Sequence, residues 1–216
     1  MTSSNNRVLQ IYNARKTILE LLHTTGNYNI DDYKGFSINE IDVMLNSNQL
    51  DMLLSEGNSL SEGNSSKTYV KFHLGKNLNE NSLQPIIEDL FILTDTLTTK
   101  DTLVVIYEGG DPNDSLKTHL KYKFSHDNIF VVVHNIKRLQ FNLLQHHLMP
   151  SNISILTDME TTELMQKYHL NKLQELPEIS RFDPMALAIG LRPGKVCKFN
   201  RKSPTALLAE YYRICI

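Results

Sequence analysis

The chain has 216 residues, 41% of them hydrophobic, and a formal net charge of −2 at pH 7. This length allows one large domain or two of moderate size, each with a buried core. No apolar run approaches the roughly 20 residues of a membrane helix, and the polar start at residues 1–6 has no signal-peptide core, so we expect an intracellular protein with no membrane partner. The two cysteines, Cys197 and Cys215, lie in apolar strand patterns, which favours structural thiols over a disulfide or metal ligands.

The first predicted helix covers residues 8–22. Its apolar side chains recur at helical spacing, with Arg15 and Lys16 on the other side, and Gly26 supplies a stop. A second helix is predicted from about Asn39. After it, the residues SEGNS at 55–59 recur at 61–65. This turn-rich duplication predicts a mobile loop over about 55–66.

Beyond this loop the pattern alternates between strands and helices. Val70, Phe72 and Leu74 alternate with polar residues and predict a half-buried strand, after which Ser82 is expected to cap a helix with Ile86, Leu90, Leu93 and Leu97 on one face. Apolar runs at 103–107 and 129–133 predict two buried strands, with a helix at 115–124 between them. This order predicts a layered α/β domain over residues 1–142.

No catalytic pattern is complete in this predicted domain. A nuclease of the restriction type needs an acid at one strand end and a Glu-x-Lys pair on the next, but Glu108 is followed by Gly at position 110. The loop 109–114 lacks the Gly-Lys-Ser/Thr ending of a phosphate cradle and is predicted to be an exposed turn. The histidines have neither the spacing nor the cysteine partners of a zinc site. We therefore predict no catalytic residues, no metal and no cofactor.

The last seventy residues have a different character. Thr157 and Glu160 form a capping-box pattern, and Asp183 before Pro184 predicts a capped short helix that ends at Gly190. Strands at 195–199 and 211–215 complete a predicted small antiparallel β module with two helices. Residues 181–216 hold seven basic and two acidic residues, a net of +5, which leaves −7 on residues 1–180. Such asymmetry fits an acidic or nucleic-acid partner and equally a solvated basic face.

A set of spaced motifs in this region carries a family resemblance. The motifs are His147-Leu148-Met149-Pro150, the capping box, Leu176-Pro177, Asp183-Pro184, residues 190–196, residues 201–206 and Tyr212-Arg213. Together they resemble the assembly module of RNA polymerase subunit 5, whose archaeal counterpart consists of this module alone. Residues 1–142 more weakly resemble the jaw domain of the eukaryotic-type subunit, through the helix 8–22, the strand 103–107 and the turn 109–112. The extra domain implies a eukaryotic or large-virus polymerase.

The resemblance implies a noncatalytic component of a multisubunit DNA-directed RNA polymerase. Residues 143–216 would be the assembly module, which fastens to the largest subunit and lies near the small subunit 6. Residues 1–142 would be the jaw domain, with a nuclease-like fold that lacks an active site, near downstream duplex DNA and in contact only with its backbone. The location would be the nucleus for a cellular enzyme, and a cytoplasmic viral factory or the virion for a viral one.

Site residues follow from the same resemblance, position by position. The expected subunit-interface residues are Pro150, Pro177, Asp183, Pro184, Gly190, Gly194, Lys195, Arg201, Ser203, Thr205 and Arg213. The expected DNA-proximal residues are Gly110, Pro112, Lys117, Lys121 and Lys123. A role in folding alone explains the glycines and prolines equally well. The family usually has glycine where this chain has Leu207, which predicts a different bend there.

Two other functions remain open at this point. One is a nuclease-like enzyme with a divergent metal site, joined to a polymerase-binding module. The other is a transcription regulator that binds the polymerase without being a stoichiometric subunit. The first predicts metal-dependent DNA cleavage that is lost on changing Glu108, and the second predicts substoichiometric association with the polymerase.

Overall fold

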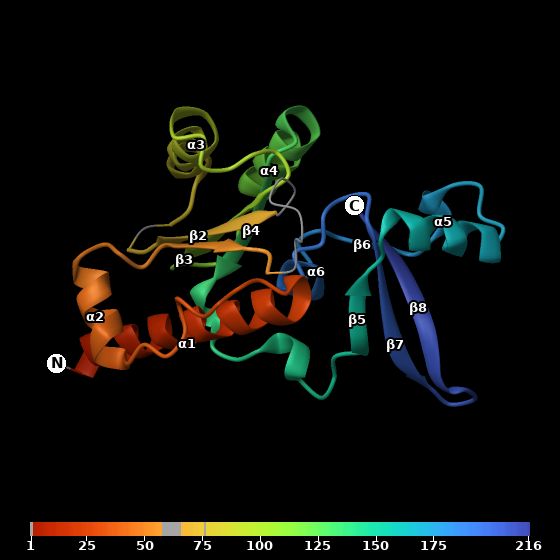
Figure 1. Ribbon diagram of the computed structural model, residues 1–216, viewed down its shortest axis with the longest axis horizontal. Helices are drawn as coiled ribbons and strands as arrows, with labels where there is room; N and C mark the ends of the chain where they lie inside the picture. The colour runs from red at the N-terminus through yellow and green to blue at the C-terminus, as the bar shows by residue number, and fades with distance from the viewer. Residues whose placement is uncertain (1, 58–65, 76) are drawn as a thin grey trace. The chain divides into compact units, whose positions relative to one another are not determined.

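A computed structural model describes residues 2–57, 66–75 and 77–216 (Figure 1). The chain divides into two compact units, which we call the first unit, Met1–Asn142, and the second unit, Leu143–Ile216. Among the described residues, no helix is both long and apolar enough to cross a bilayer.

A four-stranded sheet forms the centre of the first unit. Its strands lie in the order β1 (Met52–Ser55), β2 (Lys67–His73), β3 (Thr102–Tyr107) and β4 (Phe130–Asn135). The pairing of β1 with β2 is antiparallel, whereas β2, β3 and β4 run parallel. Every residue of β4 and nearly every residue of β3 is buried, as expected for parallel strands covered on both faces.

Helices cover both faces of this sheet. They are α1 (Thr2–Gly26), α2 (Ile38–Asn46), α3 (Glu80–Glu88) with its π-helical continuation η1 (Asp89–Leu93), α4 (Asp114–Asp127) and the short 3-10 helix η2 (Ile136–Leu139). The ribbons of α3 and α4 lie on one side of the sheet and that of α1 on the other (Figure 1). The α/β class predicted from the sequence is confirmed.

Several local predictions for the first unit were wrong. Arg15, expected on the outward side of α1, is buried, because the segment after α1 folds back over it and its guanidinium donates to the carbonyl of Leu50. The short strand β1 was not foreseen, and it takes Ser55 from the start of the predicted loop. Residues 58–65 of that loop lie outside the described residues.

The helix after β2 begins earlier than predicted. Its N-cap is Asn79, and Ser82 is the third helical residue, whose hydroxyl accepts from the Asn79 backbone N–H. This start changes which side chains face inward: Leu83, Ile87 and Leu90 are buried, whereas Leu93 is exposed. Leu97 is buried, although it lies beyond the helix. Leu74 likewise lies past the end of β2.

One tyrosine occupies the outer edge of this sheet at β1. The Tyr33 hydroxyl donates to the carbonyl of Leu53 at 3.1 Å and accepts from the Leu53 backbone N–H at 3.2 Å. Because β1 is the edge strand of this sheet in the part of the chain that the structure describes, the tyrosine satisfies backbone groups of Leu53 that have no neighbouring strand there.

The second unit also has a four-stranded sheet, in the order β5 (Ser151–Ile155), β7 (Val196–Ser203), β8 (Leu207–Cys215) and β6 (Glu178–Ile179). Strands β5, β7 and β8 pair antiparallel, but β6 runs parallel to β8. The two strands predicted at 195–199 and 211–215 pair antiparallel, as expected, whereas β6 was not predicted because so short a strand shows no periodicity in the sequence. Helices α5 (Asp158–Lys167) and α6 (Pro184–Ala188) and the 3-10 helices η3 (Leu143–Gln145) and η4 (Leu173–Glu175) complete the unit.

Helix capping in this unit follows the sequence closely. The Thr157 hydroxyl accepts from the Glu160 backbone N–H, and the Glu160 carboxylate accepts from the Thr157 N–H, so the predicted capping box is confirmed. The Thr157 N–H and the Thr157 hydroxyl both donate to the Glu160 carboxylate, which holds the pKa of Glu160 below its usual value. At α6, Asp183 accepts from the Met185 N–H, and Pro184 occupies the first turn.

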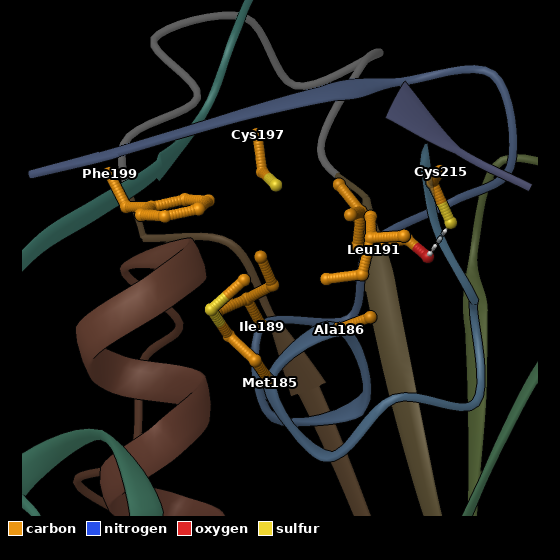
Figure 2. Packing of buried hydrophobic residues seen from close by; sticks show 8 residues of the cluster. Met185, Ala186, Ile189, Leu191, Cys197, Phe199 and Cys215 are labelled. Carbon is orange, nitrogen blue, oxygen red and sulfur yellow. Dashed lines mark hydrogen bonds between the residues drawn. The ribbon is translucent and has the colours of Figure 1, made fainter. Parts of the chain in front are cut away.

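Two small cores lie on opposite faces of the second sheet. Cys197 and Phe199 of β7 pack with the α6 residues Met185 and Ala186 (Figure 2). Val196, which points to the other face because side chains alternate along a strand, packs with Leu164 of α5.

Both cysteines belong to the core on the α6 side and are free and buried, as predicted for structural thiols. The Cys215 thiol donates to the Leu191 carbonyl (Figure 2). Burial raises the pKa of Cys215 to about 11, so its reactive thiolate form is scarce at neutral pH.

The β7–β8 hairpin contains the Leu207 position at which the resemblance anticipates glycine. Leu207 has φ of +57° and is 86% exposed, so an L-residue occupies a left-handed conformation that glycine adopts more easily. We expect Leu207→Gly to raise the free energy of unfolding of the second unit by about 0.5–1 kcal/mol, after allowance for the greater freedom of glycine in the unfolded chain. Denaturant titration would measure this change.

The matched control is the neighbouring Leu208→Gly. Leu208 lies outside the residues with positive φ, so glycine there brings no conformational relief and is expected to lower the stability. A loss of stability in both variants would contradict the assignment of strain to Leu207.

Candidate protein-binding groove

A groove of about 840 Å³ opens on the second unit, and we call it the basic groove. Four of the expected interface residues line it: Pro150, Asp183, Arg201 and Arg213. They come from the residue before β5, the cap of α6, strand β7 and strand β8, so residues 63 positions apart in the sequence, from 150 to 213, share one surface.

Apolar side chains form much of the lining of the basic groove. Ile179, Met185 and Phe199 are buried residues of the core on the α6 side and form part of its floor. Leu148 and Leu208, which are exposed, also line it. A groove that continues from a packed core to exposed leucines is the kind of surface that another polypeptide covers.

The charges around the basic groove are predominantly positive. Arg201, Lys202 and Arg213 line it, against the single carboxylate of Asp183, which is already engaged as the cap of α6. The Nε atom of Arg213 is buried and has no hydrogen-bond partner among the described residues. The groove therefore offers cationic donors suited to acidic side chains beside an apolar floor.

The other expected interface residues lie outside the lining of this groove. Lys195 forms an ion pair with Asp158 of α5 at 2.5 Å. Ser203 and Thr205 lie at the β7–β8 turn, where their hydroxyl oxygens are 3.3 Å apart. Pro184 occupies the first turn of α6, and the carbonyl of Pro177 accepts from the Ile214 N–H.

The two glycines among these residues have clear backbone roles. Gly190 follows α6 with φ of +62°, and Gly194 turns the chain into β7 with φ of +84° while its N–H donates to the Cys215 carbonyl. A Cβ at either position would meet nothing within 4 Å, so conformation rather than crowding favours glycine. Their geometry accounts for both residues through folding alone.

The expected DNA-proximal residues lie at the turn before α4 and along that helix. The Gly110 carbonyl accepts from the Tyr107 hydroxyl at 2.9 Å. Lys117 pairs with Asp114 at 2.9 Å, and Lys123 pairs with Asp127 at 3.1 Å. Both ion pairs lie within α4 and partly neutralise Lys117 and Lys123.

Two further features belong to the turn itself. Pro112 lies between Asp111 and the cap of α4, Asn113, whose side chain accepts from the Leu116 N–H. Asp111 pairs with Arg138 at 2.9 Å, so its charge is partly neutralised.

Glu108, the residue that a nuclease mechanism would assign to a metal, is fully engaged. Both of its carboxylate oxygens accept from Arg7, at 2.8 Å from Nε and 3.0 Å from Nη2, and Oε2 also accepts from the Gly75 N–H. An arginine fork on a carboxylate leaves little capacity for a divalent ion. Among the described residues, no group of three or more His, Cys, Asp or Glu side chains is placed to hold a metal.

Sequence reasoning missed several residues that line the basic groove. Leu148 and Lys202 lie within motifs of the resemblance but were not expected at the interface, and Asn200 and Leu208 lie outside those motifs. Their common surface depends on the pairing of β7 with both β5 and β8, which no local pattern encodes. In the sequence, the excess of basic residues from position 181 onward was the signal that could have indicated a positively charged groove.

Comparison with known proteins places the second unit in a class of polymerase modules. Residues 141–215 match the family model described as RNA polymerase Rpb5, C-terminal domain. A protein of Thermococcus onnurineus named DNA-directed RNA polymerase subunit Rpo5 is 40% identical over 77 residues, which are 36% of this chain and 92% of the relative. The protein of the same name from Methanosarcina mazei is 39% identical over 77 residues, or 36% of this chain and 96% of the relative.

The chain belongs to the subunit 5 family of DNA-directed RNA polymerases. A third relative of the same name, from Pyrococcus abyssi, is 39% identical over 77 residues, 36% of this chain and 92% of the relative. Because the matched segment lies almost wholly within Leu143–Ile216, the second unit carries the membership.

Proposed function

We propose that the chain is a stoichiometric, noncatalytic subunit of a multisubunit DNA-directed RNA polymerase, attached through the basic groove of its second unit. The observation that supports this most is the groove itself, which gathers Pro150, Asp183, Arg201 and Arg213 in the unit that carries the family match. The partner at this groove is the largest subunit, with the small subunit 6 nearby.

The chemistry of the groove limits what its partner presents. Arg201, Lys202 and Arg213 place positive charge along the groove. The floor of Ile179, Met185 and Phe199 accepts apolar side chains. A segment that combines apolar anchors with acidic residues satisfies both halves of this surface.

The first unit takes the role of the jaw domain near downstream duplex DNA, as a nuclease-like layered sheet without an active site. Its support is the mixed four-stranded sheet with helices on both faces, together with a Glu108 occupied by Arg7. Any contact with DNA is with the backbone and comes from α4, which carries Lys117, Lys121 and Lys123. The location that follows is the nucleus for a cellular enzyme, and the viral factory or virion for a viral one.

Affinity purification of the tagged chain from its native source tests the proposal. We expect recovery in near-equal molar amount with the two largest polymerase subunits, measured by quantitative mass spectrometry. Recovery far below equal amounts would instead support the polymerase-binding regulator. Absence of polymerase subunits from the purified material would contradict the proposal.

A further inference from the structure

Strand β5 forms an open edge of the second sheet. It pairs with β7 on one side and, in the part of the chain that the structure describes, has no strand on the other. Edge strands usually carry charged side chains or proline, which discourage further pairing, but β5 has neither. At β1, by contrast, the edge of the first sheet is occupied by Tyr33.

The register of β5 shows which of its backbone groups face this edge. The Leu156 N–H donates to the Val196 carbonyl at 2.9 Å, so this pair of residues is hydrogen-bonded across the two strands. The neighbouring pair is Ile155 with Cys197. Hydrogen-bonded and non-hydrogen-bonded pairs alternate along an antiparallel ladder, so the N–H and the carbonyl of Ile155 point away from β7.

The opposite side of β7 gives the same result. The Cys215 N–H donates to the Lys195 carbonyl at 3.0 Å, which makes Lys195 a residue whose backbone groups face β8. Cys197 lies two residues further along β7 and pairs with Arg213 of β8. By the same alternation, Cys197 directs its own N–H and carbonyl to β8, and Ile155 therefore has no hydrogen bonds with it.

Both ends of the open stretch are defined. Toward the amino terminus, a register shift and the φ of +52° at Asn152 mark a β-bulge. Toward the carboxyl terminus, the Thr157 N–H donates to the Glu160 carboxylate, and the Thr157 carbonyl accepts from the Thr161 N–H. Because these last groups belong to the cap of α5, any pairing along this edge is short and centred on Ile155.

The side chains beside the edge differ between the two faces of the sheet. Ile155 is 38% exposed and lies on the same face as its partner Cys197, where Ile153 packs against the core. Ser154 lies on the other face, and it lines a groove of about 570 Å³ together with Asn152. An added strand would meet apolar side chains on the α6 side and polar ones on the α5 side.

The groove on the α5 side, which we call the polar groove, offers one unoccupied carboxylate. Glu160 is engaged in the capping box. Glu210 pairs with Lys198 at 2.5 Å and lies 4.0 Å from the amine of Lys167. Glu163 of α5 is exposed, lines the polar groove and has no ion pair or hydrogen bond with any residue that the structure describes. A cationic side chain beside the edge would find its partner there.

The open edge is continuous with the basic groove. Pro150 and Ser151, which lead into β5, are both part of the lining of the basic groove. A polypeptide that lies in the basic groove and leaves it at Ser151 reaches Ile155 by following β5. This continuity favours the same partner at both places.

We propose that the partner polypeptide held in the basic groove continues as an extended strand along the outer edge of β5, with its backbone hydrogen-bonded to Ile155. Its apolar residues face the side of the sheet that carries Ile155, and a lysine or arginine faces Glu163. The inference rests on the proposed function and adds the mode of docking, which is the addition of a β-strand.

A proline at position 155 tests the backbone part of this proposal. Proline removes the N–H that faces the open edge but no hydrogen bond with β7, and edge strands tolerate proline at such positions. We expect Ile155→Pro to reduce recovery with the two largest polymerase subunits by about fivefold or more, with little change in denaturant unfolding. Ile155→Val, which keeps the N–H and a branched apolar side chain, should be incorporated normally. Normal incorporation of a folded Ile155→Pro chain would overturn the proposal.

Amide hydrogen exchange on the unaltered chain tests the same contact without a variant. The Ile155 N–H is expected to exchange rapidly in the free chain and about tenfold or more slowly in the purified polymerase, because an added strand would accept its hydrogen bond. Equal exchange in the two states would contradict strand addition, even if the proline variant does not fold.

The side-chain part of the proposal has its own matched pair of variants. Glu163→Gln removes the charge that faces the added strand and should reduce incorporation about twofold or more. Glu178→Gln makes the same change at an exposed position of β6, at the opposite edge of the sheet, and should have no effect. Equal incorporation of both variants would contradict the pairing with Glu163.

The outcomes also separate this inference from the proposed function. Equimolar recovery of the unaltered chain with normal incorporation of Ile155→Pro would keep the subunit and overturn strand addition. Failure to recover polymerase with the unaltered chain would overturn the proposed function itself. Dimerisation of the free chain that Ile155→Pro abolishes, measured by sedimentation, would assign the edge to a second copy and overturn the assignment to the polymerase partner.

Discussion

Charge reversal by Arg201→Glu is expected to reduce the amount of the chain recovered with the two largest polymerase subunits by about tenfold or more. Arg201 is exposed and lines the basic groove, so a glutamate there would face an acidic partner segment with repulsion in place of attraction. Like charges brought together in an interface cost several kcal/mol, and about 1.4 kcal/mol already corresponds to a tenfold change. Quantitative mass spectrometry of the purified polymerase measures the effect.

Two controls accompany this variant. Lys172→Glu makes the same charge change at an exposed position of the second unit outside the lining of the basic groove, and it should leave incorporation nearly unchanged. Lys117→Glu alters the first unit and should weaken incorporation less than Arg201→Glu does. Equal incorporation of the Arg201 and Lys117 variants would contradict the assignment of the basic groove to the assembly surface.

The largest effect on stability is expected from Leu191→Ala. Leu191 is 1% exposed and packs in the core shared by α6, β7 and β8 (Figure 2). Truncation of a buried leucine removes its burial free energy and leaves a cavity, at a cost of about 3–5 kcal/mol. In so small a unit, this is a large part of the total stability. Amide hydrogen exchange, followed on peptides from residues 143–216, should show a broad loss of protection.

The matched control for this truncation is Leu148→Ala. Leu148 belongs to the same unit but is 77% exposed, so the same chemical change should alter the free energy of unfolding by no more than about 0.5 kcal/mol. Comparable loss of protection in both variants would contradict the core that Figure 2 shows.

The sequence predicted most accurately the elements that depend on residues close together along the chain. The capping box of Thr157 and Glu160 and the cap at Asp183 depend on residues only two or three positions apart, and both are present. The apolar runs that form β3 and β4 were long enough to be recognised as strands, with ends that shifted by one or two residues.

What the sequence did not predict depends on distant contacts. Arg15 is buried because a segment about 20 residues further along the chain covers it, which helical periodicity alone cannot indicate. The parallel pairing of β6 with β8 and the recruitment of Leu148 and Leu208 to the groove arise from the fold of the whole second unit. Of the eleven interface residues that the resemblance implies, four line the basic groove, and their role at an interface stays a prediction.

The tyrosine at the edge of the first sheet has a consequence for the chain before assembly. A polymerase subunit made in excess of its partners must persist alone, and an open strand edge is where such a chain would join other copies into aggregates. Strand β1 is only four residues long, and a single hydroxyl, that of Tyr33, occupies both the N–H and the carbonyl of Leu53. An incoming strand would have to displace that hydroxyl before it could form its central pair of hydrogen bonds. The Tyr33 side chain, whose ring also lies beside Arg15, thus closes this position of the edge strand to an incoming strand.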